Sequence, residues 1–180
     1  NISKINHGKM NIMWLQRGGQ TMTLKIALLQ IMPAGTLEEN LKKGISCCRK
    51  AKEKGADIAL FPEMWSNGYE ISEDVNELKE MAVPADGDFV KAFGELAAEL
   101  DMAIAVTILE QHEPLPRNTV ILFDRHGERQ YTYAKVHTCD FGDEIILDAG
   151  DEFFVVDFSA DMQHRYRMLS QEEVKNILDE

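Results

Sequence analysis

Short apolar runs alternate with amphipathic stretches along most of this chain, and this alternation constrains its fold more than any other feature. Residues 24–30 (LKIALLQ) have the length and composition of a strand that is buried on both faces of a sheet. Residues 57–61 (DIALF) form a second predicted strand. Between the two, Thr36 and Glu39 make a capping box that opens a helix, and Gly55 ends it.

The rest of the pattern adds a second helix and a meander of strands. The first helix has an apolar stripe on one face, made of Leu37, Leu41, Ile45, Cys48 and Ala51. A second helix over about residues 88–100 turns another apolar set inward, namely Phe89, Phe93, Leu96 and Leu100. Strands are expected at residues 102–109, at 118–124 and 128–136 as a hairpin around Gly127, and at 153–158. This order predicts an α/β domain rather than a helix bundle or an all-β domain.

The chain carries 31 acidic residues against 19 basic ones, which gives a formal net charge of −12 at pH 7. Such a field repels phosphate backbones and anionic lipid head groups, so neither nucleic acid nor a membrane surface is expected as a partner. No apolar run approaches the length that spans a bilayer. The cysteines, Cys47, Cys48 and Cys139, show no CxxC spacing, which favours neither a zinc site nor a disulfide framework and fits a reducing cytoplasm.

Both ends of the chain differ from the middle in composition. Residues 1–21 are polar and basic without a sustained period, and the orderly sequence begins at Met22. Residues 17–22 (RGGQTM) can be encoded by a purine-rich stretch that resembles a bacterial ribosome-binding site, so we predict residues 1–21 to be a non-native or upstream leader. The predicted domain spans residues 22–158, and residues 159–180 form a divergent polar tail that ends in an acidic amphipathic helix.

Glu63 directly follows the second predicted strand, in the sequence FPEMW. The carboxyl ends of strands are where α/β proteins bind ligands, because the connecting loops there are free to vary. The neighbours Phe61, Met64 and Trp65 would partly desolvate the carboxylate, as suits a general base that works near neutral pH. The alternative is an exposed loop glutamate without a role, and from this feature alone that alternative carries more weight.

Lys135 ends a predicted strand in which Tyr131, Tyr133 and Lys135 alternate onto one face. An ammonium group drawn inward is costly without neighbouring carboxylates, so a functional Lys135 implies that it pairs with Glu63 or Glu144. The alternative is an edge-strand lysine that discourages aggregation.

Glu144 lies in a loop rich in carboxylates, DFGDE at residues 140–144. The loop lacks the spacing of an EF-hand, so we expect no metal site there. Cys139 is close to Lys135 in sequence, but a loop cysteine without an orienting base does not by itself indicate a nucleophile.

Five elements follow one another along the chain: FPE at 61–63, NTVILFD at 118–124 with Gly127, YAKVH at 133–137, Glu144, and GDEF at 150–153. In this order they resemble the nitrilase (carbon–nitrogen hydrolase) superfamily, and the resemblance extends from residue 24 to residue 158. Each element is weak alone, but their order is specific.

The resemblance implies an α-β-β-α sandwich of the nitrilase type with a Glu-Lys-Cys constellation and no cofactor. By motif, Glu63 would be the general base, and Lys135 would stabilise the oxyanion of a tetrahedral intermediate. Glu144 matches a further glutamate that the family places beside the lysine. The implied substrates are small amides, nitriles or carbamoyl compounds, and the family also forms homo-oligomers.

The chain departs from the family where the GDEF strand should lead to an elbow with the nucleophilic cysteine. Residues 159–180 contain no cysteine, and none of the three cysteines matches that position. We therefore interpret the chain as the N-terminal half of an incomplete sandwich, from a truncated, internally deleted or frameshifted gene, and expect it to be inactive alone. The alternative is a non-catalytic α/β binding module, or pseudoenzyme, that retains the pocket of Glu63, Lys135 and Glu144.

Overall fold

A computed structural model of the chain describes residues 5–6, 11–12, 24–139, 142–156 and 166–168. One five-stranded sheet dominates these residues, in the order β3-β4-β5-β6-β7. Its strands are β3 (Ile26–Leu28), β4 (Ile58–Leu60), β5 (Ala103–Glu110), β6 (Arg117–Phe123) and β7 (Arg129–Ala134). The first three strands are parallel, and β5, β6 and β7 form an antiparallel meander, as the sequence predicts.

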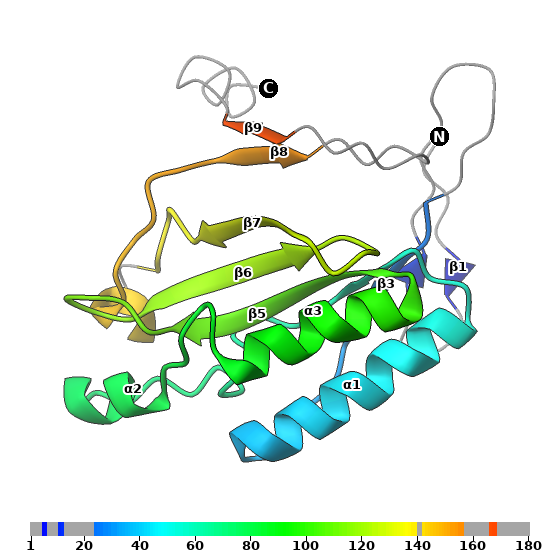
Figure 1. The fold of residues 1–180 in the computed structure, drawn as a ribbon. Helices are drawn as coiled ribbons and strands as arrows, with labels where there is room; N and C mark the ends of the chain where they lie inside the picture. The colour runs from blue at the N-terminus through cyan, green and yellow to red at the C-terminus, as the bar shows by residue number, and fades with distance from the viewer. Residues whose placement is uncertain (1–4, 7–10, 13–23, 140–141, 157–165, 169–180) are drawn as a thin grey trace.

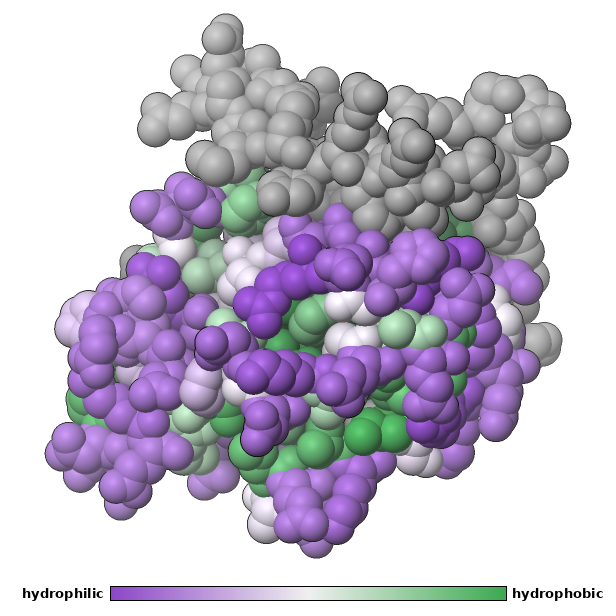
Figure 2. All heavy atoms as spheres, viewed as in Figure 1, coloured by the Kyte–Doolittle hydropathy of each residue, from purple (hydrophilic) through white to green (hydrophobic). Residues whose placement is uncertain are grey.

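Two helices, α1 (Leu37–Glu53) and α3 (Asp88–Leu100), lie side by side on one face of the sheet (Figure 1). The side chains between the helices and the sheet form the main core, which contains the predicted inward residues of α3 and the alternate strand residues Ala27, Ala59, Ile104 and Ile121. In the same view, hydrophilic residues cover most of the described surface, and apolar ones show between them (Figure 2). None of the helices in the described ranges is long and apolar enough to cross a bilayer.

Helix α1 begins at Thr36, whose hydroxyl accepts a hydrogen bond from the Glu39 backbone N–H at 3.2 Å. The Glu39 carboxylate accepts from that hydroxyl at 2.9 Å, so the Glu39 carboxylate binds the cap side chain instead of an orphan backbone amide. The buried line of the helix also differs from the predicted stripe. Its members are Asn40, Gly44, Cys48 and Ala51, whereas Leu37 is exposed.

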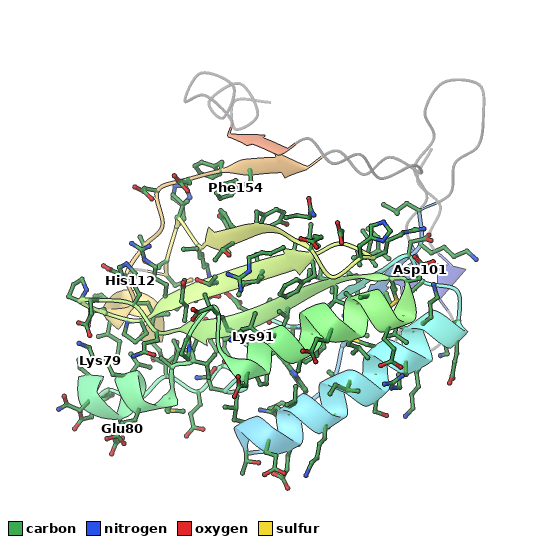
Figure 3. The ribbon with its side chains drawn as sticks, viewed as in Figure 1. Lys79, Glu80, Lys91, Asp101, His112 and Phe154 are labelled. Atoms are coloured by element: carbon green, nitrogen blue, oxygen red, sulfur yellow. The ribbon has the colours of Figure 1, made fainter. Side chains whose placement is uncertain are left out.

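The opposite face of the sheet receives the other alternate side chains. One row across the five strands consists of Leu28, Leu60, Ala105, Leu122 and Tyr131, which are paired strand by strand. The ring of Tyr131 stacks on that of Phe154 with centroids 5.7 Å apart. Phe154 begins β8 (Phe154–Val156), which lies beyond β7 on this side of the sheet (Figure 3).

Strand β3, predicted to be buried on both faces, is instead an edge strand of the sheet. Its Ala27 is buried against the helices, whereas Ile26 and Leu28 are half-buried on the other face. The prediction of full burial was wrong for the face away from the helices, because an apolar run does not show how completely that face is covered; the central strand β4 has the same pattern, with Ala59 buried and Ile58 and Leu60 half-buried.

One short pair of strands lies in the predicted leader, and a second pair joins the predicted domain to the tail. In the leader, β1 (Ile5–Asn6) pairs antiparallel with β2 (Asn11–Ile12). In the tail, β9 (Tyr166–Met168) pairs antiparallel with β8. The rest of both segments, including the acidic helix predicted at the end of the chain, lies outside the described residues.

Gly44 leaves room in α1 for an aromatic cluster, since a Cβ there would lie 2.9 Å from the Phe93 ring and 3.0 Å from the rings of Phe61 and Trp65. Alanine would favour the helix by about 1 kcal/mol, but overpacking a core costs about 1–3 kcal/mol. We expect Gly44→Ala to lower the free energy of unfolding, measured by urea denaturation. The control Ser46→Ala, on the exposed side of the helix, should change it by less than about 0.5 kcal/mol. A Gly44→Ala chain more stable than the original would contradict the packing argument.

Candidate active site

Glu63 lies on a turn that follows β4 and is fastened to β5 by the hydroxyl groups of Thr107 and Ser66, of which Ser66 accepts from the Leu109 backbone N–H at 3.0 Å. The Thr107 hydroxyl donates to the Pro62 carbonyl and accepts from the Trp65 backbone N–H at 3.1 Å. These two bonds hold the backbone on both sides of Glu63. The next residue, Met64, has a φ of 46°, which is uncommon for a residue other than glycine. Backbone strain of this kind persists where the surrounding structure enforces it, and it concentrates at functional sites.

The apolar neighbours of Glu63 do not enclose its carboxylate as the sequence analysis expected. Phe61 and Trp65 are buried in the main core, and Met64 is buried in a second small cluster. The Glu63 side chain itself is 46% exposed. The apolar residues therefore anchor the turn, while the carboxylate stays accessible at the rim of the sheet.

Lys135 follows β7, where its backbone N–H donates to the Asn118 carbonyl at 2.8 Å. Its Nζ lies 2.7 Å from Glu63 Oε1 and 3.0 and 2.9 Å from the two carboxylate oxygens of Glu144. The predicted proximity of Glu63, Lys135 and Glu144 is thus confirmed. Burial acts to lower the pKa of Lys135, but hydrogen bonds and charges from the two carboxylates raise it above its usual value.

Glu144 lies on a short 3-10 helix, Asp143–Ile146, and is only 1% exposed. Besides Lys135, it accepts from the Asn118 side-chain amide at 2.8 Å and from the Cys139 backbone N–H at 2.9 Å. Burial acts to raise the pKa of Glu144, but these hydrogen bonds and the Lys135 charge lower it to about 2. Glu144 is therefore a carboxylate at neutral pH, and it keeps the lysine charged and in place.

Two further residues of the site were missed by the sequence analysis. Asn118 donates from its side-chain amide to both Glu63 and Glu144. Tyr69 has a φ of 65°, and burial together with the charges of Glu144 and Glu63 raises the pKa of its hydroxyl. The one sequence feature that pointed to Asn118 was its position as the first residue of the NTVILFD element.

All three cysteines are unpaired. Cys47 and Cys48 lie on α1, on the helix side of the sheet, and burial raises the pKa of the Cys48 thiol. Cys139 is the cysteine beside the site, and its backbone N–H contacts Glu144. Among the described residues, no group of three or more His, Cys, Asp or Glu side chains is arranged to hold a metal ion.

The sequence model of the carbon–nitrogen hydrolase family matches residues 25–158. The chain belongs to the carbon–nitrogen hydrolase family. The match contains Glu63, Lys135 and Glu144, and it ends within two residues of β8.

Curated relatives of this carbon–nitrogen hydrolase chain include amidases. It is 26% identical to N-carbamoylputrescine amidase of Oryza sativa subsp. japonica, over 76% of this chain and 47% of the relative. It is also 26% identical to the omega-amidase NIT2 of Bos taurus, over 75% of this chain and 51% of the relative. The chain thus spans about half the length of these two relatives.

Solved structures confirm the fold. An amidase from Nesterenkonia sp. superposes with a TM-score of 0.63 and 23% identity, over 78% of this chain and 53% of the amidase. The NitFhit protein of C. elegans superposes with a TM-score of 0.61 and 22% identity, over 71% of this chain and 33% of that protein. The α/β architecture predicted from the sequence is therefore that of nitrilase-type proteins, of which this chain matches a part.

Proposed function

We propose that this chain carries the base and the cation of an amidase-type hydrolase that cleaves non-peptide C–N bonds in small amides, nitriles or carbamoyl compounds. The observation that supports this most is the contact of Lys135 Nζ with Glu63 Oε1 at 2.7 Å, in which the side chain of Glu63 stays half-exposed. Both relatives are amidases by name, and one is named for the small compound N-carbamoylputrescine, which supports the substrate class. Three unpaired cysteines are consistent with a cytoplasmic location, which we also propose.

In the proposed mechanism, Glu63 removes the proton of a thiol as the sulfur attacks the amide carbon. Negative charge then develops on the substrate oxygen, where the fixed charge of Lys135 stabilises it. Glu63 returns the proton to the leaving nitrogen as the C–N bond breaks. Water then attacks the thioester with Glu63 as base again, and the thiol is restored with release of the acid.

The thiol is the part of the mechanism that this chain does not supply. The sequence has three cysteines; two of them lie on α1, and the backbone N–H of the third is directed at Glu144. We infer that the chain alone turns over no amide. The second candidate is a non-catalytic module, or pseudoenzyme, that binds a small ligand at the charges of Glu63, Lys135 and Glu144. This candidate is favoured by the fact that the chain keeps all three charges but has no thiol assigned as the nucleophile.

A small thiol added to the chain separates the two candidates. With 2-mercaptoethanol and a short-chain p-nitroanilide, the catalytic proposal predicts p-nitroaniline release that depends on Glu63. Because a general base contributes about 10²–10⁴-fold, we expect Glu63→Gln to lower the thiol-dependent rate at least about a hundredfold. Equal rates for the original chain and Glu63→Gln would favour the binding module.

Without added thiol, we expect no ammonia release from short amides, nitriles or carbamoyl compounds above the level of Glu63→Gln. Cys139→Ser tests the cysteine beside the site, and Cys47→Ser on α1 is the matched control. Ammonia release that disappears in Cys139→Ser but persists in Cys47→Ser would overturn the inferred inactivity and identify Cys139 as the nucleophile.

A further inference from the structure

Asn118 occupies the centre of the charged cluster, although it carries no charge. It lies near the start of β6, is 6% exposed, and is paired with Leu109 of β5 on one side. On the other side its carbonyl accepts from the Lys135 backbone N–H at 2.8 Å. The sheet therefore fixes the backbone of Asn118, and with it the position from which the side chain extends.

The side-chain amide of Asn118 bridges the two carboxylates. Its Nδ2 lies 2.6 Å from Glu63 Oε1 and 2.8 Å from Glu144 Oε1. An amide NH₂ group has two hydrogens, so it can donate one to each carboxylate at the same time. The same two oxygens accept from Lys135 Nζ at 2.7 and 3.0 Å. Each Oε1 thus receives one charged and one neutral donor.

The neutral donor matters for the charge of the cluster. Two carboxylates and one ammonium group carry a net charge of −1, so one carboxylate charge is not balanced by the lysine. A second cation in place of Asn118 would cancel this charge and weaken Glu63 as a proton acceptor. Asn118 supplies hydrogen bonds without doing so.

The hydrogen bonds found for Glu63 side-chain oxygens among the described residues all end on Oε1. Two donors on one oxygen restrict the rotation of the carboxylate and leave its other oxygen available. The Glu63 side chain is 46% exposed, so Oε2, which has no hydrogen-bond donor among the described residues, belongs to a carboxylate that a reacting group can reach.

We propose that Asn118 is a positioning residue that holds Oε1 of Glu63, so that Oε2 is the oxygen that takes and returns the proton. The proposal rests on the proposed role of Glu63 as general base. Asn118 acts through Glu63 and does not itself touch the reacting atoms. It also joins Glu63 to Glu144, so that base and cation keep one fixed geometry.

The first test observes the two side-chain N–H protons of Asn118 by ¹H–¹⁵N NMR in the full chain. Their signals are assigned by their loss in Asn118→Leu. We expect Glu63→Gln to shift one proton upfield and Glu144→Gln to shift the other. If neither proton responds, or if both respond only to one replacement, the bridge is absent and the proposal is overturned. This readout is independent of any reaction.

The second test measures thiol-supported release of p-nitroaniline. Asn118→Leu keeps the branching of the side chain but removes both donors, and we expect kcat to fall about tenfold with KM little changed, as for a group that acts on the base. Asn118→Asp, which adds a carboxylate to the cluster, should also displace the pH profile. Asn76→Leu, on the exposed surface of α2 (Val75–Met81), is the control and should change neither.

The two tests distinguish failure of this inference from failure of the proposed function. If the NMR shifts follow the expected pattern and Glu63→Gln leaves the rate unchanged, the bridge stands and the hydrolase proposal fails. If Glu63→Gln abolishes the reaction while Asn118→Leu matches the original chain in rate and pH profile, the positioning role is refuted and the hydrolase proposal stands.

Discussion

Replacing Lys135 by methionine is expected to lower the free energy of unfolding at pH 7 by about 3 kcal/mol. Lys135 is the cation that contacts both carboxylates, and Glu144 is 1% exposed. Removing one partner of a buried pair leaves an uncompensated charge, at a cost of about 3–5 kcal/mol. We expect the lower end of this range because the Lys135 side chain is 28% exposed, so water already screens part of the interaction.

The size of this effect should depend on pH. The pKa of Glu144 is lowered from 4.5 to about 2, so its contribution to stability is complete above pH 4.5 and is lost as the pH falls through 2. Without Lys135 that pKa rises, and the buried carboxylate of the variant becomes neutral at a higher pH. The difference in unfolding free energy between the two chains should therefore narrow as the pH falls from about 4.5 toward 2.

The matched control is Lys42→Met, which breaks an exposed pair with Glu38 in α1. Water and salt screen an exposed pair of this kind, so the control should change stability little. Urea denaturation of the three chains at pH 7 and at pH 3 is the measurement. A loss of stability at Lys135 no larger than that at Lys42, or one that grows on acidification, would refute the electrostatic account.

The cluster of Glu63, Lys135 and Glu144 could be anticipated from the sequence because it depends on the attraction between opposite charges. An ammonium group drawn inward is costly without carboxylate partners, so a functional Lys135 implied a pair with Glu63, after a predicted strand, or with Glu144, in a carboxylate-rich loop. The distances of 2.7 and 2.9 Å confirm this pairing. The catalytic roles of the three residues remain predictions.

Polar residues that act through tertiary contacts could not be predicted in the same way. An asparagine suits turns, caps and cores, so the bridging position of Asn118 depends on chain segments far away in sequence. Asn40 shows the same limit in α1. Its side chain accepts from the Ala34 backbone N–H at 2.6 Å and donates to the Ser66 carbonyl at 3.3 Å. These hydrogen bonds satisfy the polar side chain of Asn40, so it can be buried. The prediction of an apolar stripe counts only hydrophobic residues and therefore does not include Asn40.

The short helix α2 was not predicted either. Its sequence, VNELKEM, has one buried residue, Leu78, and so lacks an apolar stripe long enough to be recognised. The available signal was Asp74, whose carboxylate caps the helix by accepting from the Asn76 backbone N–H at 2.8 Å. Capping residues can reveal a helix of this length when periodicity does not.

Trp65 should be the most sensitive position of the turn that carries Glu63. It is 1% exposed, its ring lies 5.5 Å from that of Phe61, and its indole N–H donates to the Asn40 carbonyl at 3.2 Å. Truncating a buried tryptophan to alanine costs about 3–5 kcal/mol, because the lost burial is accompanied by a cavity. We expect Trp65→Ala to lower the unfolding free energy by this amount, measured by circular dichroism in urea.

Two further variants separate the contributions to this loss. Trp65→Phe keeps most of the apolar contact with Phe61 but removes the donor to Asn40, so it should cost about 1–2 kcal/mol. Met32→Ala removes a side chain that is 76% exposed and should change stability by less than about 0.5 kcal/mol. If Trp65→Ala and Trp65→Phe cost the same, the hydrogen bond to α1 rather than packing would fix the turn. If both match Met32→Ala, Trp65 does not anchor Glu63, and the turn must be held by its other hydrogen bonds, those of Thr107 and Ser66.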